Sequence, residues 1–389
     1  MNTFAILGLV AILAFIAPFF ARALRLPIVV GEILFGVIVG TIIHGLANLG
    51  VAIDLTSSTL EVLSTLGFVT LMFMIGMEND FEELRNLSRS EKWGMILIVS
   101  STFLIAILAS VLIGLPTMVG LILGGVSVAV VVPVLKELNL SKTRFGFKIM
   151  LIAQIADVAA IFLLSFSAAS VSGWITLLEL VLIPILFMLL FWLMDTLIWY
   201  VPSLMSRILN PRDQAELGTR AALASMLIFY GVALFIGIEA ILGAFLSGML
   251  FSAIFKERGP MMEKLNPLGY GFLIPIFFIY QGFEVSILEI DWTAFILLIF
   301  MTLVAFMAKI IPLALSRYFR HRRSDLAGAV LLGTNLSVVV AGVKIGGEAG
   351  ILDEKLSSIL ILYGVISCVL FPMVFRWIQR RYISDLLER

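Results

Sequence analysis

Charged residues are scarce in this sequence. Of its 389 residues, 13% are Asp, Glu, Lys or Arg and 61% are hydrophobic, whereas about a quarter of the residues of soluble domains are charged. This composition excludes a water-soluble fold. There is also no excess of positive charge, because 26 Lys and Arg balance 26 Asp and Glu. We therefore expect a lipid bilayer as the surroundings and no nucleic-acid partner.

Cysteine and histidine are almost missing. Cys368 is the single cysteine, which excludes a disulfide within the chain and a cysteine-rich metal site. The two histidines, His44 and His321, fall in predicted loops on opposite membrane faces. The sequence also has neither an H-E-x-x-H nor a G-x-S-x-G pattern, two signatures of hydrolytic enzymes. We expect a protein that is not an enzyme and holds no transition metal or other cofactor.

Long apolar runs fill the chain, separated by short polar gaps. Runs of about 17 to 25 residues match the thickness of the hydrocarbon layer when they are helical. The sequence therefore predicts an all-α polytopic membrane protein. Its thirteen predicted helices cover residues 3–21, 27–43, 59–77, 93–113, 117–136, 146–169, 174–199, 217–236, 240–255, 267–283, 292–315, 325–345 and 354–377.

The basic residues predict the orientation. If the N-terminus lies outside, Lys344 and Lys355 are outside, Lys309 is within the membrane, and every other Lys or Arg is on the inner side. Loops on the cytoplasmic side are rich in Lys and Arg. We therefore expect a multi-pass protein of the cell (inner) membrane with an external N-terminus and a cytoplasmic C-terminus.

Two predicted helices carry polar and helix-breaking residues and resemble each other. The segment 123–134 reads LGGVSVAVVVPV and the segment 332–343 reads LGTNLSVVVAGV, with a shared Leu, Gly and three Val. The chain would enter them from opposite sides of the membrane, as in inverted repeats with crossed discontinuous helices. The alternative is that Gly, Ser and Val recur because small residues help membrane helices to pack.

Asp157 is the leading candidate for a functional residue. It lies nine residues after Lys148, or about 14 Å along a helix. Lys309 precedes Arg317 by eight residues, or about 12 Å, so both groups lie near the membrane midplane. Ionisable residues at this depth are costly and usually mark an ion or proton path. Glu32 is closer to the predicted cytoplasmic side, and we interpret it as a packing residue there.

A buried carboxylate such as Asp157 can be neutralised by a proton or by a cation, so the two compete for one site. Gln154, three residues earlier, faces the same side of a helix and can add an amide oxygen. Lys309 can pair with the carboxylate when the cation is absent. An alternative role for the two charges is a purely structural salt bridge. Further oxygen ligands for a monovalent cation, Na⁺ or K⁺, are expected from Ser127, Thr334, Asn335 and Ser337.

Four motifs occur in order along the chain: RLPIVVGEILFGVIVG (25–40), TLGFVTLMFMIGMENDFEEL (65–84), GIEAILGAFLSGML (237–250) and PIFFIYQGFEV (275–285). With these motifs the chain resembles the monovalent cation:proton antiporter superfamily, in its Kef-type and NapA-type branch. This resemblance implies the thirteen-helix NhaA/NapA-like fold, a homodimer, the family's conserved aspartate at Asp157, its basic residue at Lys309, and polar broken-helix positions at Ser127 and at Thr334 to Ser337.

The family also implies a division into domains. We expect dimerisation-domain helices in residues 1–92 and 203–290, a core transport domain in 93–170 and 291–389, and a linker helix in 171–202.

The predicted function is secondary active exchange of Na⁺ or K⁺ for H⁺ by alternating access at Asp157. The sequence departs from the family where Ala156 precedes this aspartate, because relatives commonly have Asp, Asn or Gln there. We therefore expect one cation per proton. The alternatives are a Kef-like potassium efflux channel or transporter, and an organic-anion carrier of the same fold.

Overall fold

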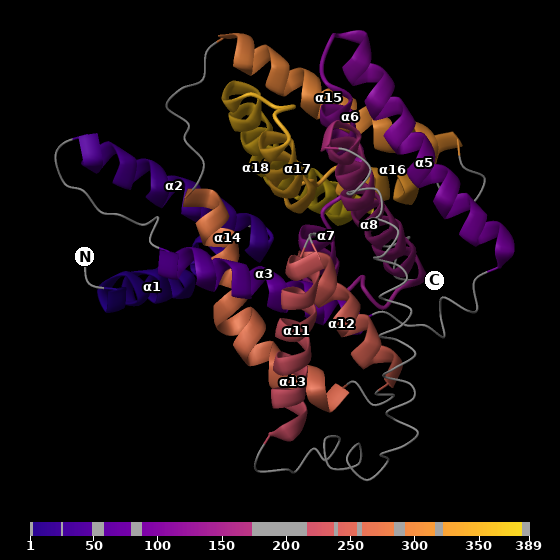
Figure 1. The fold of residues 1–389 in the computed structure, drawn as a ribbon. Helices are drawn as coiled ribbons and strands as arrows, with labels where there is room; N and C mark the ends of the chain where they lie inside the picture. The colour runs from indigo at the N-terminus through magenta and orange to yellow at the C-terminus, as the bar shows by residue number, and fades with distance from the viewer. Residues whose placement is uncertain are drawn as a thin grey trace. The chain divides into compact units, whose positions relative to one another are not determined.

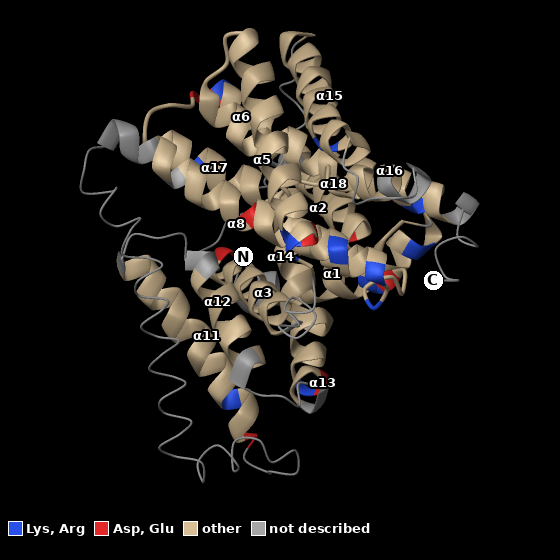
Figure 2. Ribbon diagram, turned by 90° about the vertical axis from the view of Figure 1, so that its right-hand side faces the viewer, with Lys and Arg blue, Asp and Glu red and all other residues tan. Residues whose placement is uncertain are grey.

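The structure, a computed structural model, describes residues 3–24, 26–48, 58–78, 88–172, 216–236, 240–254, 259–283, 292–315 and 322–382 (Figure 1). Within these ranges the regular elements are all helices. Seven of the described helices or helix pairs are long and apolar enough to cross a membrane, and α1 with α2 can add an eighth span. In Figure 2 the ribbons are uncharged over most of their length, in agreement with the low charge content. The fold class predicted from the sequence is thus confirmed as helical and membrane-spanning.

The helices follow the predicted segments closely. Helix is present in every predicted segment that falls on described residues, whereas the predicted helix at 174–199 lies outside them. The total of thirteen therefore stays a prediction. Three predicted segments, 117–136, 267–283 and 325–345, contain more than one helical element each. The helices are α1 (Thr3–Ala23), α2 (Ile28–Asn48), α3 (Ser58–Glu78), α5 (Arg89–Leu112), α6 (Thr117–Gly124), α7 (Val128–Glu137), α8 (Arg144–Ser172), α11 (Leu217–Ile236), α12 (Ala240–Ile254), α13 (Gly259–Leu268), η1 (Gly269–Leu273), α14 (Ile274–Phe283), α15 (Trp292–Leu315), α16 (Arg322–Leu331), α17 (Ser337–Glu348) and α18 (Glu354–Tyr382).

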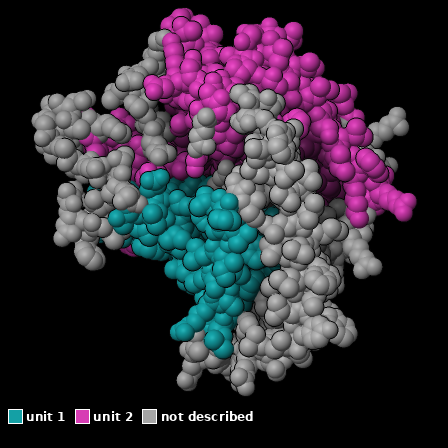
Figure 3. Space-filling view, viewed as in Figure 1, with its two compact units in different colours: residues 1–14, 54–86, 173–278 teal, residues 15–53, 87–172, 279–389 magenta. Residues whose placement is uncertain are grey.

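The chain forms two compact units (Figure 3). The first contains residues 1–14, 54–86 and 173–278. In its described part α3 packs against α12, and α12 packs against α11. Gly76 and Gly248 lie where α3 and α12 cross, because a Cβ built on either would lie 2.2 Å or less from a carbonyl oxygen of the other helix. Small residues let membrane helices approach this closely.

The second unit contains residues 15–53, 87–172 and 279–389. It holds α5 to α8 and α15 to α18, and also α2, which contacts α7 and α18. The predicted core segments 93–170 and 291–389 both fall in this unit, together with residues 15–53, which we had assigned to the dimerisation domain. The functional division into dimerisation and transport domains remains a prediction.

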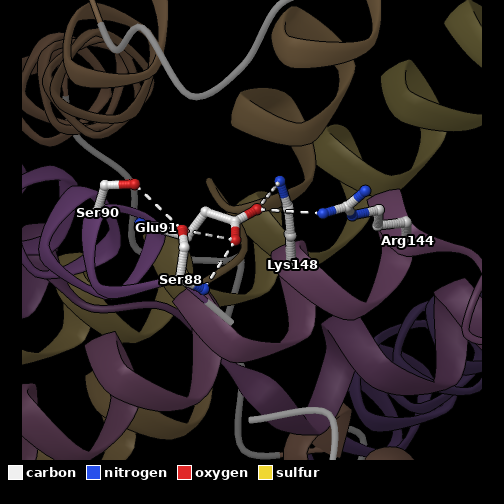
Figure 4. Close-up of polar contacts among 5 residues, drawn as sticks. All are labelled: Ser88, Ser90, Glu91, Arg144 and Lys148. Carbon is white, nitrogen blue, oxygen red and sulfur yellow. Dashed lines mark hydrogen bonds and ion pairs between the residues drawn. The ribbon is translucent and has the colours of Figure 1, made fainter. Parts of the chain in front are cut away.

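An ion-pair cluster joins α5 to α8 (Figure 4). Ser88 caps α5, with its hydroxyl accepting from the Glu91 N–H at 3.2 Å while the Glu91 carboxylate accepts from the Ser88 N–H at 3.1 Å. Oε1 of the same carboxylate lies 2.9 Å from the Lys148 ammonium and 3.5 Å from Arg144 Nη2. A reciprocal cap satisfies two backbone donors at a helix start. The cluster therefore fixes the first turn of α5 against the helix that carries Asp157.

Candidate functional site

Both interrupted helices predicted from the sequence are broken, and their breaks contact each other in the second unit. The first break lies between α6 and α7, at residues 125–127, and the second between α16 and α17, at residues 332–336. The Ser127 N–H donates to the Thr334 carbonyl at 2.8 Å. A Cβ built on Gly125 would lie 2.6 Å from a Val338 methyl group, so glycine is needed for the backbones to meet here. Whether the two segments are inverted repeats stays a prediction.

Asp157 lies at this crossing. The carboxylate is carried by α8 and is 5% exposed. Ser337 Oγ lies 3.4 Å from its Oδ1 and 3.0 Å from Ser127 Oγ. The backbone N–H of Val128, the first residue of α7, also interacts with the carboxylate. The N-terminal ends of α7 and α17 thus meet an acidic side chain, which the positive end of a helix dipole stabilises in its anionic form.

Lys309 lies at the C-terminal end of α6, whereas Asp157 lies at the N-terminal ends of α7 and α17. Its side chain is 1% exposed, and its ammonium donates to the carbonyl of Leu123, in the last turn of α6. The last carbonyls of a helix have no partner within the helix, and a cation is favoured beside them. Lys309 therefore stabilises the break in the first interrupted helix from its α6 side.

Asn335 connects the two breaks by hydrogen bonds. Its side-chain amide donates to the carbonyl of Ile122 in α6, and its backbone N–H donates to Ser367 Oγ of α18 at 3.0 Å. Thr334, by contrast, turns its hydroxyl to the carbonyl of Leu331 in its own segment, at 2.9 Å. The structure therefore places Asn335 in a supporting position, and Thr334 meets the first break through its backbone carbonyl.

The roles predicted for Gln154 and Lys309 stay predictions. Gln154 lies on α8 three residues before Asp157, and its expected role as an amide-oxygen ligand for the cation remains a prediction. No ion pair among the described residues joins Lys309 to Asp157. The amine is bonded to the α6 carbonyl instead. The pairing of Lys309 with Asp157 remains a prediction for another step of a transport cycle.

Sequence reasoning missed two residues behind the crossing. Ser367 bonds the Asn335 N–H, and its own hydroxyl donates to the Gly364 carbonyl at 2.7 Å. Tyr363, which is fully buried, has its side chain against that of Asn335. Both stand in an otherwise apolar run of α18. A polar residue buried in such a run usually has a hydrogen-bond partner, and this signal could have identified Ser367.

Three oxygen-bearing side chains, from Asp157, Ser127 and Ser337, therefore converge within hydrogen-bonding distance at the two breaks. One carboxylate with neutral hydroxyls presents a single negative charge and several hard oxygen donors. Oxygen ligands of this kind suit hard cations, and the carboxylate can bind a proton instead. The arrangement can hold one monovalent cation or one proton.

Comparison with known proteins gives a consistent result. The family model described as "Sodium/hydrogen exchanger, transmembrane" matches residues 11–381. The protein YjbQ of Bacillus subtilis (strain 168) is 31% identical over 97% of this chain, which spans 63% of that relative's length. A Na(+)/H(+) antiporter of Enterococcus hirae is 27% identical over 99% of this chain and 100% of its own. Among solved structures, the sodium proton antiporter MjNhaP1 from Methanocaldococcus jannaschii matches with a TM-score of 0.62 and 14% identity, covering 98% of this chain and 96% of that one.

Proposed function

This chain belongs to the sodium/hydrogen exchanger family, and we propose that it is a secondary antiporter that exchanges a monovalent cation, Na⁺ or K⁺, for a proton at Asp157. The observation that carries this proposal is the buried Asp157 carboxylate beside Ser337 and Ser127 at the crossing of two broken helices. Intramembrane carboxylates at discontinuous helices are typical binding sites for coupling ions.

Competition at one carboxylate couples the two ions. When Asp157 is ionised, the hydroxyls of Ser127 and Ser337 add oxygen ligands for the cation. When Asp157 binds a proton, it loses the negative charge that attracts the cation, and the cation leaves. Because Ala156 leaves one carboxylate at this point of α8, the proposed exchange is one cation for one proton.

The proposed movement is alternating access. In this proposal the segments 93–170 and 291–389 carry the ion site through the membrane, and the segments 1–92 and 203–290 form the scaffold of a homodimer, with 171–202 as the linker. Lys309 pairs with Asp157 in the step between cation release and proton uptake, which stabilises the ionised carboxylate without its cation. Both core segments belong to one compact unit, which supports their movement as a body, although that unit also includes residues 15–53 of the proposed scaffold.

The proposed exchange predicts uphill transport in proteoliposomes. An imposed proton gradient should drive uptake of radioactive Na⁺ or a K⁺ analogue against the cation's own gradient, with a rate that saturates with cation concentration. Comparing Na⁺, Li⁺ and K⁺ identifies the substrate. A rate that does not respond to an imposed membrane potential indicates one-for-one exchange. Cation flux that only dissipates its gradient would identify a channel instead and contradict the proposal.

Replacing Ser337 with Ala should weaken cation binding without stopping exchange. The variant loses one oxygen ligand and a hydrogen bond to an ionised group, a contact that contributes about 1.5 kcal/mol or more. We expect the Michaelis constant for the cation to rise about tenfold at a similar maximal rate. The matched control is Ser101→Ala on α5, where the hydroxyl bonds only its own helix. An unchanged Michaelis constant for Ser337→Ala would remove this residue from the site.

A further inference from the structure

A second carboxylate pair lies at the other end of α7 from Asp157. Glu137 is the last residue of α7, and α2, which packs against both α7 and α18, carries Glu32. The two carboxylates interact electrostatically. α7 spans about 14 Å between the residue that contacts Asp157 and Glu137, at 1.5 Å per residue. The first residue of α7 thus contacts Asp157 of the proposed ion site. Its last residue, Glu137, belongs to the second carboxylate pair.

Glu137 has two partners that favour a carboxylate. Its Oε2 accepts the N–H of Ile28 at 2.7 Å, and its Oε1 lies 3.3 Å from Nη1 of Arg376 on α18. The Ile28 N–H is one of the donors at the start of α2 that have no partner within the helix. A positive helix end and a guanidinium both favour the charged form of a carboxylate. Glu137 therefore joins the start of α2 to α18.

The carboxylate of Glu32, in contrast to that of Glu137, is buried without a bonding partner among the described residues. Glu32 lies one turn after Ile28 on α2, and its side chain is 4% exposed. Among the described residues, neither a hydrogen bond nor an ion pair involves its carboxylate. An anion at Glu32 would be buried, would have no hydrogen-bond or ion-pair partner among the described residues, and would lie near the Glu137 carboxylate. Two carboxylates that share a site take up a proton because they cannot both ionise cheaply.

We propose that Glu32 is a second proton-binding site, distinct from Asp157, and that its occupancy controls the junction of α2, α7 and α18. With the proton bound, Glu32 is neutral and the junction is held by Glu137, Ile28 and Arg376. Without it, Glu32 and Glu137 repel each other across the α2–α7 contact. Because α7 is one short helix, a change at Glu137 is passed to Val128 and so to the carboxylate of Asp157.

Glu137 is the charged group that acts on Glu32. Glycines hold α2 close to its neighbours, since a Cβ on Gly31 would lie 2.2 Å from that of Ala21 in α1, and one on Gly36 would lie 2.2 Å from the Ile279 carbonyl in α14. Such close packing excludes water from this side of Glu32. The elements that pack against α2 carry charged or titratable side chains, among them Arg22 of α1, Lys136 and Glu137 of α7, Tyr280 of α14 and Arg376 of α18, and of these Glu137 acts electrostatically on Glu32.

Infrared spectroscopy tests proton binding without requiring transport. In purified Asp157→Asn protein, a pH titration should show the carbonyl band of a protonated carboxyl group disappearing as the pH rises. Adding Glu32→Gln to this background should remove the band, whereas adding Glu61→Gln, at an exposed carboxyl in the first turn of α3, should leave it. If Glu32→Gln does not fold, Glu32→Asp serves instead, and its band should shift. A band that is unaffected by either change at residue 32 overturns the proposal.

Proton flux in proteoliposomes tests the control of transport, and this part of the inference rests on the proposed exchange. The midpoint of the pH dependence should move by about one pH unit or more in Glu32→Gln, since a titrating group is removed. Glu61→Gln should keep the original profile. A Glu32→Gln profile that superimposes on the original would overturn the coupling between Glu32 and the ion site. If no variant transports any cation, the proposed exchange fails while the infrared result still decides whether Glu32 binds a proton.

Discussion

An Asp157→Asn variant is expected to fold normally and to lose cation-dependent proton flux by about a hundredfold or more. Asn has nearly the same shape as Asp, and its amide oxygen can still accept a hydrogen bond from Ser337, so the contacts at the crossing survive. An amide, however, neither ionises nor exchanges a proton at physiological pH. Both the charge that attracts the cation and the group that binds the proton are therefore lost.

The measurement is cation-driven pH change inside proteoliposomes, with folding checked by the melting temperature of the purified protein. The matched control is Asp353→Asn. Asp353 accepts the Leu356 N–H at 2.7 Å and is exposed at the start of α18, and Asn caps helices about as well as Asp. This control should exchange at the normal rate. Normal exchange by Asp157→Asn would mean that the shared binding site lies elsewhere.

A Gly248→Ala variant is expected to have the largest effect on stability. The new Cβ on α12 would lie 2.0 Å from the Phe73 carbonyl oxygen and 3.0 Å from the Met77 backbone nitrogen, both on α3. These atoms belong to the backbone, so no side chain can move aside and the two helices must separate. Overpacking of this kind costs about 1–3 kcal/mol, and the loss of close packing with the facing Gly76 adds to it.

Thermal unfolding in detergent measures this effect. Gly248→Ala should unfold at a clearly lower temperature and yield less folded protein. Gly231→Ala on α11 makes the same chemical change at a position where a Cβ would meet no atom within 4 Å. It should unfold at the normal temperature or slightly above, because alanine favours helix. Equal melting temperatures for the two variants would contradict the close crossing of α3 and α12.

The sequence predicted the helices and singled out Asp157 and Lys309 as candidates because both inferences depend on one strong physical constraint. A buried charge in lipid is so costly that Asp157 and Lys309 stand out in any apolar run, and the length of the runs fixes the helices to within a few residues. The polar residues Ser127 and Ser337 were identified because they interrupt Val-rich segments. The structure then placed these two hydroxyls together beside the carboxylate.

Pairings between distant helices could not be predicted in the same way. Asp157 and Lys309 have similar depth, but depth gives no information on lateral position, and the amine bonds a carbonyl of α6. The role of Ser367 depends on α18 packing behind the second break. The position of Glu137 beside the start of α2 could not be predicted either, because the link from Ile28 through Glu137 to Arg376 joins parts of the chain more than 100 residues apart.

Cation-induced proton release tests the central claim, that a cation and a proton compete for Asp157, most directly. Purified protein in weakly buffered detergent solution is mixed with a saturating concentration of the transported cation, and the pH change is recorded. Near the pH at which half of the Asp157 carboxyl groups are protonated, saturating cation should release about half a proton per chain from the normal protein. Asp157→Asn should release none. Equal release by the two proteins, or none by the normal protein at any pH at which the cation binds, would contradict the account.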